Sequence, residues 1–357
     1  MEVVDPVVRA LRECGVDVDD ERQRRQLTPV HRAIVLDQID LLGEFRDNID
    51  ARDAFGYTPL HLAVLCASLE GVRDLLALGA DPNIQDKTLD GYTPLHIACK
   101  EGNYSMADAL LGAHVDIDLP SRRHGTALHL ATRSGNAILV ASLVKLVGAN
   151  INAKDANGRR PLHLVALEPT SFADVSPDRQ PSRQPRSLLP ELLSGKTKPE
   201  IDVRDNEGCT PLHYAAMTGN AMVLAKLILL KADVNARDAQ ERTPLHYAVC
   251  GDTVAVDSGA ASCVQLLLQA NATIDARDAL GQTPQDVLQI ILESRRWRKS
   301  EETVLKVAKS RLKKAHELQM ESARAELAAQ QVADQLLQEE NLLGANRGSR
   351  KSSARRK

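Results

Sequence analysis

Residues 208–220 read GCTPLHYAAMTGN, and the core of this stretch, TPLHYA, is a word that returns throughout the chain. Related words begin at Thr28, Thr58, Thr93, Thr126, Arg160, Thr210, Thr243 and Thr283, at intervals of 30, 35, 33, 34, 50, 33 and 40 residues. Self-similarity with a period near 33 is typical of a protein built from stacked repeats. The last word, TPQDVL, lacks the histidine.

Each word carries the signals of a short helix. In residues 208–220, Thr210 is placed to cap a helix, and Pro211 stands at the first helical position, where its missing N–H costs nothing. Gly219 is suited to end that helix in the left-handed conformation. A second helix is expected through Val223, Leu224 and Leu227. Because one such pair cannot bury its apolar face alone, neighbouring repeats must stack into a solenoid.

The word TPLHxA, the glycine after it and turns such as KADVNARD (231–238) resemble the ankyrin repeat over about residues 1–294. This resemblance implies an all-α repeat solenoid of helix-turn-helix units joined by β-hairpin fingers. It also implies a non-enzymatic scaffold or adaptor that binds one or more protein partners on the concave surface.

The domain organisation follows from the spacing and composition. Residues 1–22 are expected to form an N-terminal capping half-repeat, and residues 23–294 a solenoid of about eight repeats. The long interval after Arg160 maps to a Pro-rich inserted loop at 168–187, either a solvated insertion or a regulatory docking loop. Residues 295–343 favour one long charged helix, which is either a single solvated or partner-seeking helix or a coiled coil that self-associates through 300–343. Residues 344–357 form a basic tail that we expect to be disordered.

Seven of the ten histidines stand at the fourth position of the repeated word. The resemblance implies that each is a structural strut that hydrogen-bonds the word's threonine and the backbone of adjoining units, rather than a base or a ligand. They are His31, His61, His96, His129, His163, His213 and His246. Neither His124 nor His316 has a Cys or carboxylate constellation around it in the sequence.

Several functional classes are disfavoured by what the sequence lacks. Six cysteines are scattered without a CxxC pair, which suggests neither a metal site nor a disulfide framework. The sequence shows no Gly-rich phosphate loop, nucleophile elbow or paired-carboxylate motif, so we expect no enzyme and no cofactor. No segment approaches the length of an apolar membrane span, and no signal peptide begins the chain, so we expect a cytoplasmic and/or nuclear protein.

Charge is unevenly distributed. Residues 1–294 hold 29 Lys and Arg against 40 Asp and Glu, whereas residues 295–357 hold 16 against 8. The basic tail supports an alternative function: a nuclear or nucleic-acid-associated regulatory factor that acts through its C-terminus. The acidic solenoid argues against extended phosphate binding on the repeats, so any nucleic-acid contact should be weak and confined to the tail.

Partner-binding positions are implied by the resemblance at the fingertips and at the exposed ends of the first helices. Phe55, Tyr57 and Tyr92 are hypothesised to form an apolar centre; the alternative is that these rings pack finger against finger. The full predicted set is Phe55, Tyr57, Leu89, Tyr92, Lys100, Glu101, Arg122, Arg123, Arg133, Asn157, Arg159, Met217 and Arg242.

Overall fold

The computed structural model describes residues 27–167, 188–250, 259–294, 306–322 and 324. Within these ranges the chain forms seven successive helix pairs, each a first helix that begins at the repeated word followed by an outer helix, and then an eighth first helix. The first helices are α3 (Pro29–Val35), α4 (Pro59–Leu65), α6 (Pro94–Lys100), α8 (Ala127–Arg133), α10 (Pro161–Ala166), α12 (Pro211–Met217), α14 (Pro244–Cys250) and α16 (Pro284–Ser294). The outer helices are η1 (Ile39–Asn48), α5 (Leu69–Ala77), α7 (Tyr104–Leu111), α9 (Ala137–Ala141) with η2 (Ser142–Val147), α11 (Leu189–Leu193), α13 (Ala221–Leu229) and α15 (Gly259–Gln269).

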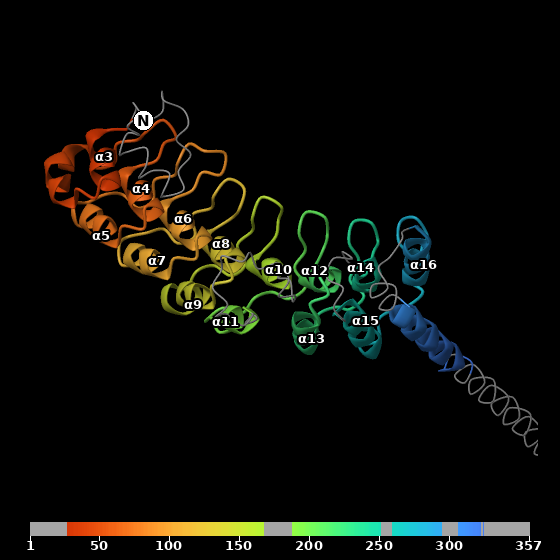
Figure 1. The fold of residues 1–357 in the computed structure, drawn as a ribbon. Helices are drawn as coiled ribbons and strands as arrows, with labels where there is room; N and C mark the ends of the chain where they lie inside the picture. The colour runs from red at the N-terminus through yellow and green to blue at the C-terminus, as the bar shows by residue number, and fades with distance from the viewer. Residues whose placement is uncertain (1–26, 168–187, 251–258, 295–305, 323, 325–357) are drawn as a thin grey trace, which may run out of the picture.

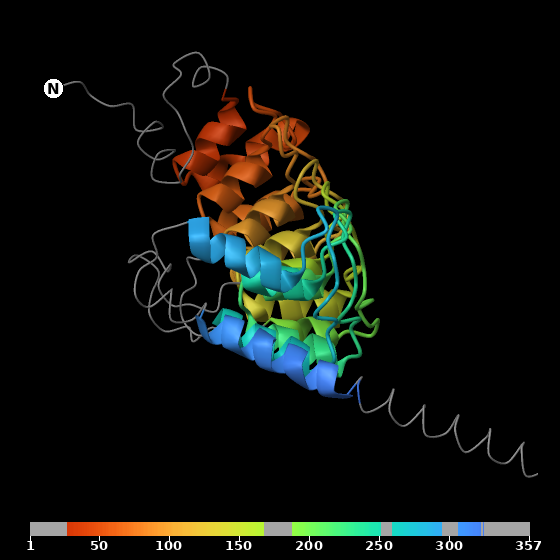
Figure 2. The same ribbon diagram turned by 90° about the vertical axis from the view of Figure 1, so that its right-hand side faces the viewer.

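The helix pairs stack side by side into a curved solenoid, which confirms the predicted fold class. Figure 1 shows the first helices in one row, the outer helices in a second row, and hairpin fingers that project from the stack between successive pairs. Figure 2 shows these fingers gathered along one edge of the stack. The fingers contain no regular strand in the described residues, and Ser121 and Gly125 form an isolated bridge.

The outer helices are less regular than the first helices. η1 is a 3₁₀-helix, η2 is a single π-helical turn that ends at Gly148 in the left-handed conformation, and α11 has only five residues. The predicted inserted loop falls between α10 and α11, but residues 168–187 lie outside the described ranges. The predicted half-repeat at 1–22 and the basic tail at 344–357 also lie outside them.

A leucine of the repeated word lies at the centre of six successive described pairs, and Val30 takes its place in the first pair. Leu60, Leu95, Leu128, Leu162, Leu212 and Leu245 are all 0–1% exposed. Burying one such side chain is worth about 1.5–3 kcal/mol. Because six successive repeats each supply one, the core continues along the solenoid rather than closing around one centre.

The histidine of the word joins each repeat to the next. In α4, His61 Nδ1 accepts the backbone N–H of Thr58 at 3.1 Å and lies 2.8 Å from the Thr58 hydroxyl, while its Nε2 lies 3.0 Å from the carbonyl oxygen of Tyr92 in the following finger. The seven histidines at this position, which we call the strut histidines, all place Nε2 3.0–3.3 Å from a carbonyl of the next finger.

This arrangement requires a neutral imidazole. The carbonyl oxygen can only accept, so Nε2 must carry the proton, and Nδ1 must stay unprotonated to accept the backbone N–H. Burial correspondingly lowers the pKa of each strut histidine, to about 4 for His31, His61, His96 and His213.

The last repeat replaces the strut histidine with Asp286. Its carboxylate accepts the backbone N–H of Thr283 at 3.0 Å and the Thr283 hydroxyl at 2.8 Å. These bonds hold the helix start as Nδ1 does in the other repeats, but a carboxylate has no donor for a further carbonyl. The substitution therefore suits the end of the array.

The helical residues 306–322 pack against this end. Ala308 and Leu312 are buried and belong to the continuous core, Ala315 is half-buried, and Arg311 donates to the carbonyl oxygen of Ala261 in α15. Figure 2 shows this helix lying along the end of the stack. Ala308 and Leu312 therefore face the solenoid, whereas Met320 further along the same apolar stripe is 45% exposed. Self-association through 300–343 stays a prediction, because most of that range lies outside the described residues.

We expect His213→Ala to lower the free energy of unfolding by about 1–3 kcal/mol, because it leaves the Thr210 N–H and the Arg242 carbonyl without their partner. His114→Ala is the matched control, since that side chain is exposed on a turn. Urea unfolding followed by circular dichroism measures both. Equal effects of the two substitutions would contradict the strut role.

Stability should also fall with acidification. The unfolded histidines have a pKa near 6.5, whereas burial lowers the pKa of every folded strut histidine, to about 4 for His31, His61, His96 and His213. The unfolded chain therefore binds more protons in this window, and the free energy of unfolding should fall by up to about 1.4 kcal/mol per pH unit for each strut histidine. Urea unfolding between about pH 7 and about pH 5 tests this, before the carboxylates titrate. A constant stability over that range would rule it out.

Candidate partner-binding surface

An aspartate at the start of most fingers fixes the finger's shape. Asp53 Oδ1 accepts the backbone N–H groups of Phe55 at 2.9 Å and Tyr57 at 2.8 Å. Asp155, Asp205, Asp238 and Asp278 make the same pair of bonds in later fingers. The side chains between these anchor points vary from finger to finger.

Backbone hydrogen bonds join neighbouring fingers. Lys87 N donates to Phe55 O at 2.8 Å, Arg122 N to Asp90 O at 2.8 Å, and Ala239 N to Glu207 O at 2.9 Å. Gly208 shows the closeness of this contact: its φ is +80°, and a Cβ there would lie 2.9 Å from Ala239 N. The fingers therefore form one continuous ledge whose tips face solvent.

The fourth finger departs from the pattern. It begins with Ser121 instead of an aspartate, and the Ser121 hydroxyl donates to the Gly125 carbonyl at 2.8 Å. The next two residues, Arg122 and Arg123, are exposed. Loss of one carboxylate and gain of two cations make this finger the positive part of the ledge.

The hypothesised aromatic centre is only partly exposed. Tyr92 is 7% exposed, its ring centroid lies 5.9 Å from that of His96, and its hydroxyl lies 3.1 Å from His124 Nδ1 of the next finger. Tyr57 is half-buried, with its ring centroid 5.7 Å from that of His61. The expectation of an exposed ring is wrong at Tyr92, because its neighbouring finger covers it; the alternative, packing finger against finger, describes this residue.

The other predicted positions differ in how far their side chains are exposed. Leu89 is 72% exposed at the tip of the third finger. The other exposed members are Lys100, Glu101, Arg122, Arg123, Arg133 and Asn157, while Phe55, Arg159, Met217 and Arg242 are half-buried. All remain candidate contact residues, and two of them also serve the fold.

Arg159 and Arg242 are held by the aspartates of their own fingers. Arg159 Nε donates to Asp155 at 3.0 Å, and Arg242 Nε donates to Asp238 at 3.0 Å. Arg242 also lies 4.6 Å from the centroid of the Tyr247 ring. A partner that used these guanidinium groups would have to compete with partly buried ion pairs.

Sequence reasoning missed two tyrosines that brace the later fingers. Tyr214 donates its hydroxyl to Asp205 at 2.6 Å, and Tyr247 donates to Asp238 at 2.8 Å. Hydrogen bonds from Tyr247 and Arg242 hold the pKa of the buried Asp238 carboxyl below its usual range, although burial opposes them. The shared TPLHYA spelling of these two repeats was the available signal.

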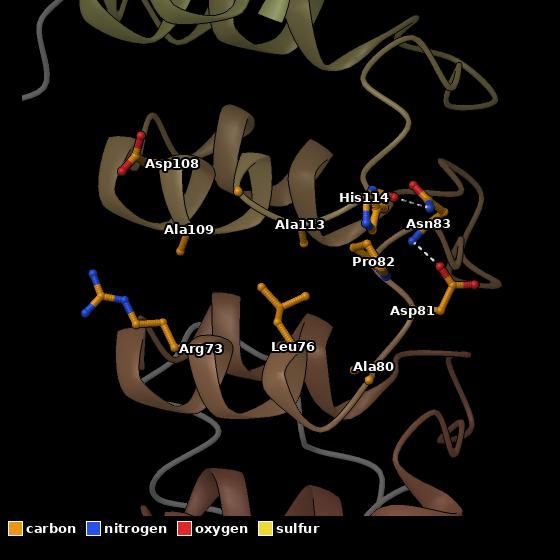
Figure 3. A pocket seen from close by; sticks show the side chains of 12 residues that line it. Arg73, Leu76, Ala80, Asp81, Pro82, Asn83, Asp108, Ala109, Ala113 and His114 are labelled. Carbon is orange, nitrogen blue, oxygen red and sulfur yellow. Dashed lines mark hydrogen bonds between the residues drawn. The ribbon is translucent and has the colours of Figure 1, made fainter.

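A groove lies between the outer helices of the second and third repeats. Figure 3 shows Arg73 and Leu76 from α5 facing Asp108 and Ala109 from α7, with His114 at the other end. The Asn83 side-chain amide donates to the carbonyl of His114 at 3.1 Å and closes that end. The lining brings together no nucleophile with a base, so the groove is described best as a junction between repeats.

The described residues hold no group of three or more His, Cys, Asp or Glu side chains that could bind a metal ion. Within the same ranges, no helix is both long enough and apolar enough to cross a membrane.

Together, the stacked helix pairs, the strut histidines and the ledge of fingers define an α-helical repeat solenoid whose variable side chains face solvent. The family model for ankyrin repeats matches residues 4–86, 48–121, 72–155, 95–171 and 182–278, and the chain belongs to the ankyrin-repeat family. This confirms the resemblance seen in the sequence.

Known relatives share the repeats but are far larger. The chain is 29% identical over 234 residues to the nuclear factor NF-kappa-B p105 subunit of Gallus gallus, an alignment that covers 64% of this chain and 22% of that protein. It is 31% identical over 117 residues to the human transient receptor potential cation channel subfamily A member 1, covering 33% and 9%. The chain therefore spans less than a quarter of either relative.

The fold also matches a solved structure. The crystal structure of the human ASB11 ankyrin repeat domain superposes with a TM-score of 0.52 at 24% sequence identity, covering 71% of this chain and 98% of that one. This similarity supports the fold alone.

Tyr92→Ala should destabilise the solenoid by about 2–4 kcal/mol, because it empties a packed site between two fingers. Tyr92→Phe should cost only about 0.5–1.5 kcal/mol, the value of the hydrogen bond to His124. Leu89→Ala, on the exposed tip of the same finger, serves as the control. Thermal unfolding measures all three, and an unchanged midpoint for Tyr92→Ala would restore this ring to the list of free anchors.

Proposed function

We propose that the chain is a non-enzymatic scaffold or adaptor that holds a protein partner on its recognition face, by which we mean the fingertips and the C-terminal ends of the first helices. Ankyrin repeats generally mediate protein–protein interactions, and the family assignment supports this class of function. The observation that carries the proposal is that Asp and His side chains fix the backbone of most fingers, so the side chains at the tips can vary.

The ends of the first helices belong to the same face. The seventh residue of each seven-residue first helix is Val35, Leu65, Lys100, Arg133, Met217 or Cys250. This position changes in size, polarity and charge from repeat to repeat, whereas the residue four positions earlier is histidine in all six helices. The residue five positions earlier is leucine in five of them and Val30 in the first. Such variation on a rigid scaffold suits recognition of a specific surface.

Figure 1 shows the fingers on the inner side of the curved stack, so a partner lying there would contact several repeats at once. We place this activity in the cytosol or the nucleus. The five described cysteines, Cys66, Cys99, Cys209, Cys250 and Cys263, form no disulfide, which fits a reducing compartment.

Photo-crosslinking in cells tests the location of the partner. A benzoylphenylalanine at Leu89, on a fingertip, should form covalent adducts with a partner protein, and the same group at Met222, on outer helix α13, should not. Leu89 and Met222 are matched because both are exposed apolar side chains, at 72% and 60%. Adducts at Met222 with none at Leu89 would move the binding surface to the outer helices.

A further inference from the structure

The recognition face carries a cluster of unpaired cations on the third and fourth repeats. Lys100 ends α6, Arg133 ends α8, and Arg123 lies on the finger between these helices. All three are exposed, and among the described residues none forms an ion pair. By contrast, Arg159 and Arg242 further along the ledge are bound to the aspartates of their own fingers.

Two observations place these three cations around one spot. Lys100 Nζ lies 5.5 Å from the centroid of the Tyr92 ring, whose hydroxyl is 3.1 Å from His124 Nδ1. Burial lowers the pKa of His124, the nearby Asp90 carboxylate opposes this effect, and Arg133, Lys100 and Arg123 lower the pKa further. The geometry agrees with this. Lys100 lies over the ring whose hydroxyl contacts His124, Arg123 directly precedes His124, and α6 and α8, which end in Lys100 and Arg133, pack against each other.

This cluster is specific to these two repeats. The equivalent helix ends elsewhere carry Val35, Leu65, Met217 and Cys250, and the fourth finger alone among the described fingers after the first repeat begins with serine instead of aspartate. The exposed tip residue Leu89 lies beside the cluster, since Arg122 donates from Nη1 to the carbonyl of Thr88 at 2.8 Å.

Resting on the function proposed above, we infer that the surface formed by Leu89, Lys100, Arg123 and Arg133 binds a short acidic segment of the protein partner. Carboxylates of that segment would pair with the three free cations, and an apolar residue of it would cover Leu89. Charge complementarity of this kind chiefly sets partner choice and association rate.

An acidic peptide fits this surface better than a nucleic acid. The patch spans two repeats, and residues 1–294 as a whole hold 40 acidic against 29 basic side chains. Asp90 and Glu101 border the cations. A long polyphosphate would meet repulsion beyond the patch, whereas a few carboxylates on a short segment would not.

Fluorescence anisotropy with defined probes tests the inference on the full chain. The probes are a fluorescein-labelled peptide of Glu, Asp and Leu, its counterpart of Gln, Asn and Leu, and a labelled oligothymidylate of similar length. The patch variant carries both Arg123→Glu and Arg133→Glu. The control variant carries both Lys145→Glu and Lys226→Glu, which make the same charge change at exposed positions of η2 and α13. Circular dichroism first establishes that both variants keep the wild-type melting midpoint.

We expect the acidic peptide to bind the wild type and the control equally, and the patch variant about tenfold or more weakly, with an affinity that falls as salt rises. Equal binding of the neutral peptide, or no difference between the two variants, would overturn the inference. Tighter, patch-dependent binding of oligothymidylate would overturn it in favour of a phosphate ligand. If peptide binding fails while Leu89 still crosslinks to a partner, only the acidic chemistry is wrong; if crosslinks form on the outer helices alone, the proposed function falls as well.

Discussion

One hydrogen-bonded unit, repeated along the array, holds this molecule together. The strut histidine accepts the backbone N–H at the start of its own helix and donates to a carbonyl of the next finger, as His61 does between Thr58 and Tyr92. Both bonds are buried, and an unsatisfied buried partner costs about 1–3 kcal/mol. Each repeat therefore depends on its neighbour for polar satisfaction as well as for its apolar core, which is why the stack behaves as one continuous body.

The same unit frees the recognition face to vary. An aspartate at the base of most fingers and the strut from the preceding repeat fix the finger backbone, so the side chains at the tip can vary without changing it. The fourth finger begins with Ser121 in place of the aspartate and displays Arg122 and Arg123. Later fingers use it differently, and tie Arg159 and Arg242 to their aspartates. One scaffold thus presents a positive section and a neutralised section side by side.

A different arrangement follows the last finger that the structure describes. Asp286 keeps the two hydrogen bonds to Thr283, but its carboxylate lacks the N–H with which a strut histidine donates to the next finger. The helical residues 306–322 then cover the exposed apolar edge with Ala308 and Leu312. A charged helix can serve this purpose because its opposite face keeps Lys313, Lys314 and Glu317 in water.

The repeated words specified the solenoid, the helix starts and the seven strut positions, because capping, periodicity and a fixed histidine are local signals that survive in every copy. The repeated words did not predict the burial of Tyr92 or the docking of residues 306–322 on the solenoid. Tyr92 is covered by His124 from the next finger, and Leu312 by helices whose position depends on the curvature of the stack. The clustering of Lys100, Arg123 and Arg133 likewise became visible only in three dimensions. These contacts join residues some twenty to fifty positions apart, and their geometry arises from how whole repeats pack rather than from any one word.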